Sequence, residues 1–179
     1  MQILRNCVFK LGRLLPDKIW ISVLYRMKMG KKLDLKNPKA FNEKLQWLKL
    51  YDRQPEHIEM VDKYAVKKKI ASLIGDEYVI PTIGTWNNVD EINFDALPTR
   101  FVLKCTHDSG GVYVCKDRND FDLNKIKEKM TRSLNRNFYA EYREWPYKMV
   151  KPRIMAEQYM EDSETHKLND YKFFVLMGG

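Results

Sequence analysis

Residues 101–117 read FVLKCTHDSGGVYVCKD and contain two short apolar runs joined by a polar loop that ends in two glycines. This pattern predicts a β-hairpin in which FVLKC pairs with VYVCK across THDSGG. Lys104 stands at the end of the first run. Glycines let backbone N–H groups come close to an anion, and a lysine ammonium supplies the charge that phosphate oxygens need. An ordinary hairpin also favours Asp, Ser and Gly in its turn, so the stretch by itself leaves both interpretations open.

Before the hairpin, apolar residues recur with helical spacing. The Asn-Pro pair at 37–38 offers a capping residue followed by proline at the first helical position, and predicts a helix over 38–51. A second helix is predicted over 55–74, ending at Gly75. Its triple lysine, residues 67–69, is typical of a solvated helix face.

After Pro81 the apolar period changes from helical to strand-like. The stretch YVIPTIGTW predicts a strand and a loop, and a further helical segment is predicted over 122–136. RIMAEQYM (153–160) and DYKFFVLMGG (170–179) are predicted strands. Helices therefore precede strands, which favours an α+β fold. Because the last strand ends in two glycines, like half of a hairpin, we expect this sequence to be a piece of a longer protein.

The positive charge of the chain is concentrated in its first part. Residues 1–70 hold 17 basic and seven acidic side chains, a net charge of +10, whereas residues 71–179 hold 15 and 17. Residues 1–15 predict a basic amphipathic helix, which would lie on an anionic membrane face or pack onto the rest of the protein, and we favour packing. Basic and aromatic residues do not interleave as in a nucleic-acid-binding module, so no nucleic acid is expected as a partner.

Cysteine usage and hydropathy favour a cytoplasmic protein. If the protein contacts the inner face of the membrane, residues 1–15 are expected to form that contact. The chain has three cysteines, no evident secretory signal and no apolar run long enough to span a bilayer. Cys105 and Cys115 flank the hairpin loop and could face each other, although buried, inert thiols are the favoured interpretation. No His/Cys spacing suits zinc, and no metal ligand is assigned.

Two further stretches place polar groups beside apolar strands. Glu157 lies at the end of the strand 153–160, where its carboxylate could accept hydrogen bonds from ribose hydroxyls. The backbone at 158–160 could bond the edge of an adenine. Asp170 and Lys172 alternate with aromatic residues and would share one face of a sheet, either at a binding site or as an ordinary cross-strand salt bridge.

Six stretches of the chain together resemble the TupA-like ATP-grasp family: NPKAFNEKLQWLKLY (37–51), VDKYAVKKKI (61–70), IGDEYVIP (74–81), FDALPTRFVLKCTHDSGG (94–111), PRIMAEQYM (152–160) and DYKFFVLMGG (170–179). Members of this family are found in bacterial cell-surface polysaccharide clusters and are often labelled glycosyltransferases. The resemblance implies an α+β, ATP-grasp-like fold. Residues 1–80 would form a basic helical part and the start of the first lobe, and residues 81–179 a nucleotide-binding portion with an antiparallel sheet that lacks the C-terminal part of the fold.

The resemblance also implies a nucleotide site. ATP-grasp proteins hold ATP and Mg²⁺ between two lobes, with lysines at the phosphates, a mobile glycine-rich loop, a hinge strand at adenine and an acidic residue at the ribose. The residues that match these positions are Lys63, Lys104, Ser109, Gly110, Gly111, Glu157, Gln158, Tyr159, Met160, Glu164 and Lys172. The Mg²⁺ ligands are expected beyond residue 179, and no catalytic residue is assigned. Asp108, beside the loop, would repel phosphates unless a cation intervenes.

Three functions are weighed on this basis. The leading one is an ATP-dependent carboxylate–amine ligase in cell-surface polysaccharide biosynthesis, acting on a glycan-linked carboxylate or amine and inactive as this fragment alone. The second is a glycosyltransferase that uses Asp120 and Asp122 as a metal-binding pair, although these aspartates more simply cap the helix that follows. The third is a non-catalytic scaffold whose basic N-terminal part binds anionic lipid or polysaccharide.

Overall fold

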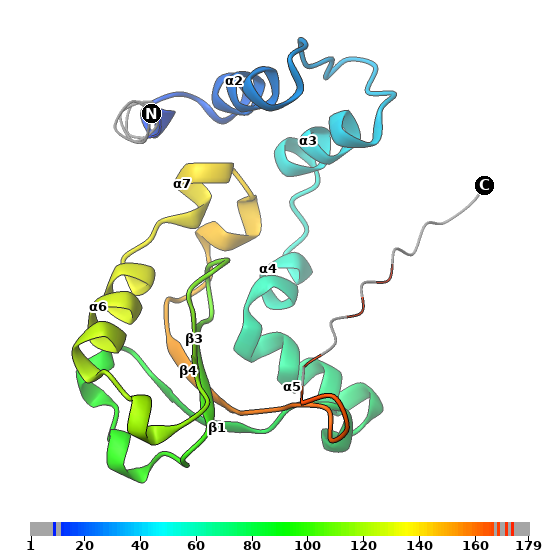
Figure 1. Ribbon diagram of the computed structural model, residues 1–179. Coiled ribbons are helices and arrows are strands. Elements are labelled where there is room, and N and C mark those ends of the chain that lie inside the picture. The colour runs from blue at the N-terminus through cyan, green and yellow to red at the C-terminus, as the bar shows by residue number, and fades with distance from the viewer. Residues whose placement is uncertain (1–8, 10–11, 167, 169–170, 172, 174–179) are drawn as a thin grey trace.

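The computed structural model describes residues 9, 12–166, 168, 171 and 173, and places helices before strands along the chain (Figure 1). The helices are α2 (Asp17–Met29), α3 (Phe41–Tyr51), α4 (Glu56–Val61), α5 (Lys63–Ile74), α6 (Leu123–Leu134) and α7 (Phe138–Tyr142). The strands are β1 (Thr82–Trp86), β2 (Phe101–Cys105), β3 (Val112–Cys115) and β4 (Ile154–Gln158). Short 3₁₀ turns join them, among them η1 (Asp76–Tyr78) and η5 (Trp145–Lys148).

The four strands form one antiparallel sheet in the order β1-β4-β2-β3. The hairpin predicted at 101–117 is confirmed, with Lys104 paired with Val112 beside the loop and Phe101 paired with Cys115 at the far end. Strand β4 pairs with both β1 and β2, and its residues 154–157 are all buried. The prediction of an α+β fold with an antiparallel sheet is therefore confirmed.

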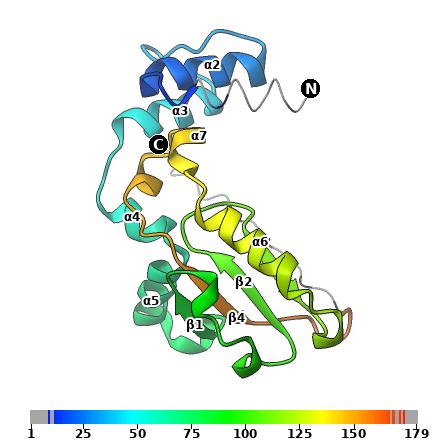
Figure 2. The same cartoon turned by 90° about the vertical axis from the view of Figure 1, so that its left-hand side faces the viewer.

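The sheet lies between two helices, as Figures 1 and 2 show, with α6 on one face and α5 on the other. Alternation along the strands directs Leu103 and Ala156 toward α6, where they form a core with Ile126 and Met130. The other face carries Lys104 and Glu157 and is reached from α5 by Lys67. One face of the sheet is thus apolar, and the other carries charge.

A buried arginine joins the N-terminal helices to the region after α6. The Arg143 guanidinium is 3% exposed, donates to the carbonyls of Gly12 (2.8 Å) and Leu15 (3.0 Å), and pairs with Asp17 at 2.9 Å. The Trp20 indole N–H donates to Glu141 O at 2.9 Å. Of the predicted helix 1–15, most residues lie outside the described part of the chain, and its described end packs on this cluster.

Two predicted helices are wrong in their bounds. The first predicted helix begins at Phe41 instead of residue 38, since the Glu43 carboxylate accepts from the N–H groups of Lys39 and Ala40 and closes the first turn. The predicted helix 55–74 is two helices separated at Asp62. The two cysteines of the hairpin are buried free thiols, the interpretation that the sequence favours, and they do not face each other, because Cys115 pairs with Phe101 at the end away from the loop.

The break at Asp62 serves two contacts at once. The Asp62 carboxylate accepts from the N–H groups of Tyr64 (2.9 Å) and Ala65 (3.3 Å) as the N-cap of α5, and pairs with Arg153 at 2.9 Å. Asp62 is 7% exposed. Since Arg153 directly precedes β4, this carboxylate ties the start of α5 to the central strand.

The predicted strand 170–179, including Asp170 and Lys172, lies largely outside the described residues. Within the residues that the structure describes, no helix combines the length and apolar character needed to cross a membrane.

We expect Asp62→Ala to lower the free energy of unfolding by roughly 1–3 kcal/mol, because it removes a helix cap and leaves Arg153 unpaired. Urea unfolding followed by circular dichroism measures the change. The control is Glu59→Ala, which removes the exposed Lys69–Glu59 pair and should change the free energy of unfolding by no more than about 0.5 kcal/mol. Equal losses in the two variants would contradict the role given to Asp62.

Candidate functional site

A pocket of about 370 Å³ opens on the charged face of the hairpin. Val102, Val112 and Val114 form an apolar floor on β2 and β3, and Lys104 lines the pocket near the loop. The segment 157–160, at the end of β4, forms a wall. The pocket therefore joins an apolar surface to a cation, and it lies on the face of the sheet opposite α6.

Glu157 holds two lysines beside this pocket. Its Oε1 accepts from Lys67 of α5 at 2.6 Å, and its Oε2 pairs with Lys104 of β2. The Glu157 side chain is 6% exposed, and burial alone would raise its pKa. The hydrogen bonds from Lys104 and Lys67 outweigh that effect, so the pKa of Glu157 lies below its ordinary value. The cluster keeps a net charge of +1 at neutral pH.

Lys63 contacts the glycine-containing loop instead of the pocket. Its ammonium donates to Cys105 O at 2.9 Å and to Asp108 O, and its backbone N–H donates to Thr106 O at 3.2 Å. Burial lowers the pKa of Lys63 below its ordinary value. This lysine holds the base of the loop against the start of α5.

The loop is also attached to the C-terminal end of α6. Arg136 donates to Ser109 O at 2.8 Å, and the Ser133 hydroxyl donates to the Asp108 carboxylate. A Cβ at Gly111 would overlap both Ser133 Oγ and the Asp108 carboxylate, which explains the glycine at this position. Gly110 has φ +97°, a conformation that favours glycine for a different reason.

His107 and Asp108 are buried under the loop, at 4% and 1% exposure. His107 Nε2 donates to Arg136 O at 3.2 Å. The Asp108 carboxylate accepts from the Ser133 hydroxyl inside the protein. That bond does not neutralise its charge, so the repulsion expected between Asp108 and a phosphate stays a prediction. Cys105 lies in the same buried region, and burial raises the pKa of its thiol to about 11, as expected for an inert cysteine.

The structure brings some of the expected nucleotide-binding residues together. Lys104 and residues 157–160 line the pocket. Lys63 donates to Cys105 O and Asp108 O at the adjacent loop, and these bonds do not reach the segment 109–111. Glu164 lies in an exposed turn closed by Asp162 and does not line the pocket. Lys172 lies outside the described residues.

Sequence reasoning missed Lys67 and the apolar floor. The triple lysine predicts a solvated helix face, but its three members have different surroundings. Lys67 pairs with buried Glu157, Lys68 lies over the Tyr64 ring at 4.5 Å, and Lys69 pairs with Glu59 at 2.7 Å. A signal was present: Lys67 follows Lys63 by four residues, so the two share one face of α5.

The wall after β4 is held by a stacked arginine. The Arg100 guanidinium lies 4.2 Å from the centre of the Tyr159 ring and pairs with Glu161 at 2.6 Å. The last ladder pair of β4 is Gln158 with Phe101, and the Gln158 N–H donates to Pro81 O at 3.0 Å. The backbone of Tyr159 and Met160 therefore lies past the sheet ladder, at the edge of the pocket.

Metal-binding and glycosyltransferase-type features find little support in the described residues. No group of three or more His, Cys, Asp or Glu side chains in that part of the chain could hold a metal ion. The Asp122 carboxylate accepts from Lys125 N at 3.0 Å as the N-cap of α6, as the sequence predicts.

Comparison with known protein families gives a match. The family model described as TupA-like ATPgrasp matches residues 43–179. That range begins within α3 and includes all four strands of the sheet and the segment 157–160 that forms the pocket wall. Neither the comparison with curated proteins nor that with solved structures returned a match.

The surroundings of His107 predict a pH dependence of stability. Burial lowers the pKa of His107 below the ordinary 6.5, although Asp108 opposes the shift. As the pH falls below 6.5, His107 becomes protonated in the unfolded chain at a higher pH than in the folded protein. The stability conferred by neutral His107 is therefore complete above pH 6.5 and is lost as the pH falls through the lower folded value.

His107→Gln removes the titrating ring and retains a donor for Arg136 O. We expect its free energy of unfolding to fall less than that of the wild type between about pH 7 and about pH 5. Urea unfolding at a series of pH values measures both curves. Parallel curves would show that His107 does not cause the loss.

Proposed function

Because the chain belongs to the TupA-like ATP-grasp family, we propose that the pocket beside Lys104 binds ATP and that the full-length protein is an ATP-dependent carboxylate–amine ligase in cell-surface polysaccharide biosynthesis. The observation that carries the proposal is the placement of Lys104. It is held by buried Glu157 between an apolar floor and the segment 157–160. A volume of about 370 Å³ is within the range of small-molecule sites.

The residues of the pocket suit the base and ribose of a nucleotide. Val102, Val112 and Val114 offer a flat apolar surface for one face of a base. The backbone past Gln158 offers donors and acceptors for its edge, as the sequence predicts. Stacking of Arg100 on Tyr159 limits the freedom of this segment, which reduces the entropy lost on binding.

Phosphates would lie toward the loop. Lys104 lines the pocket one residue before the end of β2, and its side chain remains 28% exposed despite the pair with Glu157. A partly desolvated ammonium in a fixed position stabilises phosphate charge more strongly than a mobile surface lysine does. Lys63 and the amides of 109–111 would contribute only after the contacts that now hold the loop rearrange.

The described residues do not supply a Mg²⁺ site. Glu157, the carboxylate of the pocket, is already bound by two lysines, so we assign no step to a metal here. In the proposed ligase reaction, a substrate carboxylate attacks the γ-phosphate of ATP and ADP leaves, and an amine then attacks the carbonyl of the acyl phosphate, releases inorganic phosphate and a proton, and forms an amide. The part of the chain described here binds and orients the nucleotide for the attack on the γ-phosphate.

We expect Lys104→Ala to weaken ATP binding to the full-length protein by about tenfold or more, since a charged hydrogen-bond donor at the phosphates is lost. Isothermal titration calorimetry measures the change. Lys127 lies on α6 and forms an exposed ion pair with Asp90. Lys127→Ala is the matched control and should leave the affinity for ATP unchanged.

Unchanged ATP affinity in Lys104→Ala would contradict the assignment of the pocket. Absence of ATP binding by the wild type, together with binding to acidic liposomes, would favour the scaffold. Binding of a nucleotide sugar in place of ATP would favour the glycosyltransferase.

A further inference from the structure

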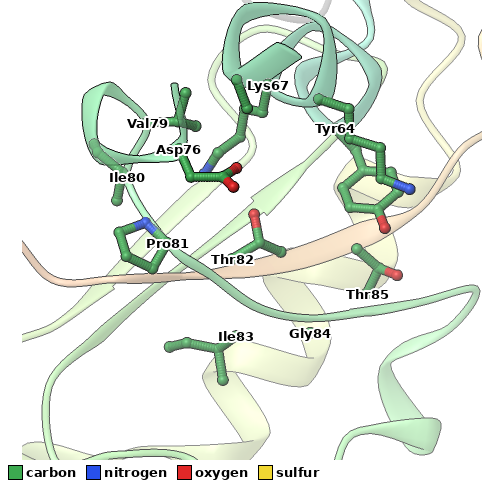
Figure 3. Close-up of a pocket in the computed structure, with 12 residues that line it drawn as sticks. Tyr64, Lys67, Asp76, Val79, Ile80, Pro81, Thr82, Ile83, Gly84 and Thr85 are labelled. Carbon is green, nitrogen blue, oxygen red and sulfur yellow. The ribbon is translucent and has the colours of Figure 1, made fainter. Parts of the chain in front are cut away.

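A second pocket, of about 530 Å³, lies between α5 and strand β1. Figure 3 shows Tyr64 and Lys67 on the helix side, with Thr82, Ile83 and Thr85 on the strand side. Asp76, Val79 and Ile80 close one end. The nucleotide proposal does not use this groove.

One wall of the groove is the outer edge of the sheet. Strand β1 is last in the order β1-β4-β2-β3, so among the described residues no strand pairs with its outer side. The Gln158 N–H donates to Pro81 O, next to β1, whereas Arg153 O accepts from the N–H of Thr106, next to β2. The backbone N–H and C=O groups of the even-numbered residues of β4 therefore point toward β1, and those of the odd-numbered residues point toward β2. Gly84 and Trp86, the β1 partners of the even-numbered residues, bond β4, and the N–H and C=O of Thr85 therefore point away from β4, toward the outer edge of the sheet. Thr85 is also one of the residues that line the groove.

The other wall is a continuous stripe of the helix. Tyr64, Lys67, Lys68 and Ala71 follow one another at the spacing of one helix face and overlook the edge of β1. An open strand edge beside a helix offers main-chain hydrogen bonds along one side and side-chain contacts along the other. Such a groove accommodates an extended peptide that adds as a further strand.

Two charges in the groove have no partner of opposite charge within the described part of the chain. Lys68 lies over the Tyr64 ring, and its ammonium makes no ion pair there. Asp76 lines the closed end, with no ion pair in the same residues. Both side chains are exposed, so a ligand that pairs with both would carry an acidic group toward Lys68 and a basic group toward Asp76.

We propose that the groove between α5 and β1 binds an extended peptide segment of a partner protein. The segment adds as a strand to the outer edge of β1, bonds the backbone of Thr85, and carries one acidic and one basic side chain. Lys67 lines the groove and also pairs with Glu157, which lines the first pocket. The bound peptide therefore lies next to the ion cluster without occupying the proposed nucleotide site.

The test begins with selection of random octapeptides displayed on phage against the wild-type protein. Affinities of the selected synthetic peptides are then measured by fluorescence polarisation. Ala71→Trp fills the groove and should weaken binding at least tenfold, whereas Ser72→Trp adds the same bulk at an exposed neighbouring position outside the groove and should not.

A second pair of variants tests the main-chain bond. Thr85→Pro removes the outward N–H without removing a bond to β4 and should weaken binding, whereas Thr85→Val keeps the N–H and should retain binding. Only every second N–H of an added strand bonds β1. Methylating that set of peptide nitrogens should abolish binding, whereas methylating the other set should not, and this test needs no protein variant. Lys68→Glu should weaken binding of peptides with an acidic residue facing it.

Several results would overturn the proposal: no peptide selected, peptides that bind all variants equally, or peptides indifferent to backbone methylation. A wild-type dimer that Thr85→Pro dissociates would show instead that β1 pairs with a second copy of the chain. Calorimetry with ATP keeps the two proposals separate, because Ala71→Trp should bind ATP as the wild type does even if no peptide binds.

Discussion

A buried carboxylate between two ammonium groups organises the charged face of this protein. Glu157 lies on the central strand, and its two lysines come from the neighbouring strand and from the helix across that face. Removing a carboxylate from water is costly, and two charged hydrogen bonds offset the cost. The same contacts fix Lys104 at the pocket and anchor α5 to the sheet, so stability and the proposed binding chemistry rest on one group.

The glycine-containing loop is held by a second set of contacts that favours its present position. Lys63 donates to Asp108 O and Arg136 donates to Ser109 O, and the Asp108 carboxylate accepts from the Ser133 hydroxyl. The Lys63 ammonium is therefore already bonded to two backbone carbonyls, those of Cys105 and Asp108. A phosphate that reached Lys63 would have to replace these bonds, and the bonds from Arg136 and Ser133 would still hold the loop. Closure of the loop over a bound phosphate would therefore require that these contacts also break.

Much of the fold could be predicted from the sequence because its signals are local. The hairpin at 101–117 follows from alternation and a glycine turn, and the pairing of Lys104 with the segment 157–160 follows from the resemblance to ATP-grasp proteins. The spacing of Lys63 and Lys67 places both on one helix face, but the break at Asp62 and the partner of Lys67 could not be predicted, because Arg153 and Glu157 lie about 90 residues away in sequence. The positions of Glu164 and of the groove beside β1 likewise depend on tertiary packing and not on local pattern.

The most direct test of this account is a pH titration of the Glu157 side-chain carboxyl by carbon-13 NMR. With two ammonium groups bound to it, the carboxyl should titrate at a midpoint below the ordinary glutamate value of 4.5. A midpoint at or above 4.5 would show that burial prevails over the lysines and that Glu157 does not hold Lys104 at the pocket.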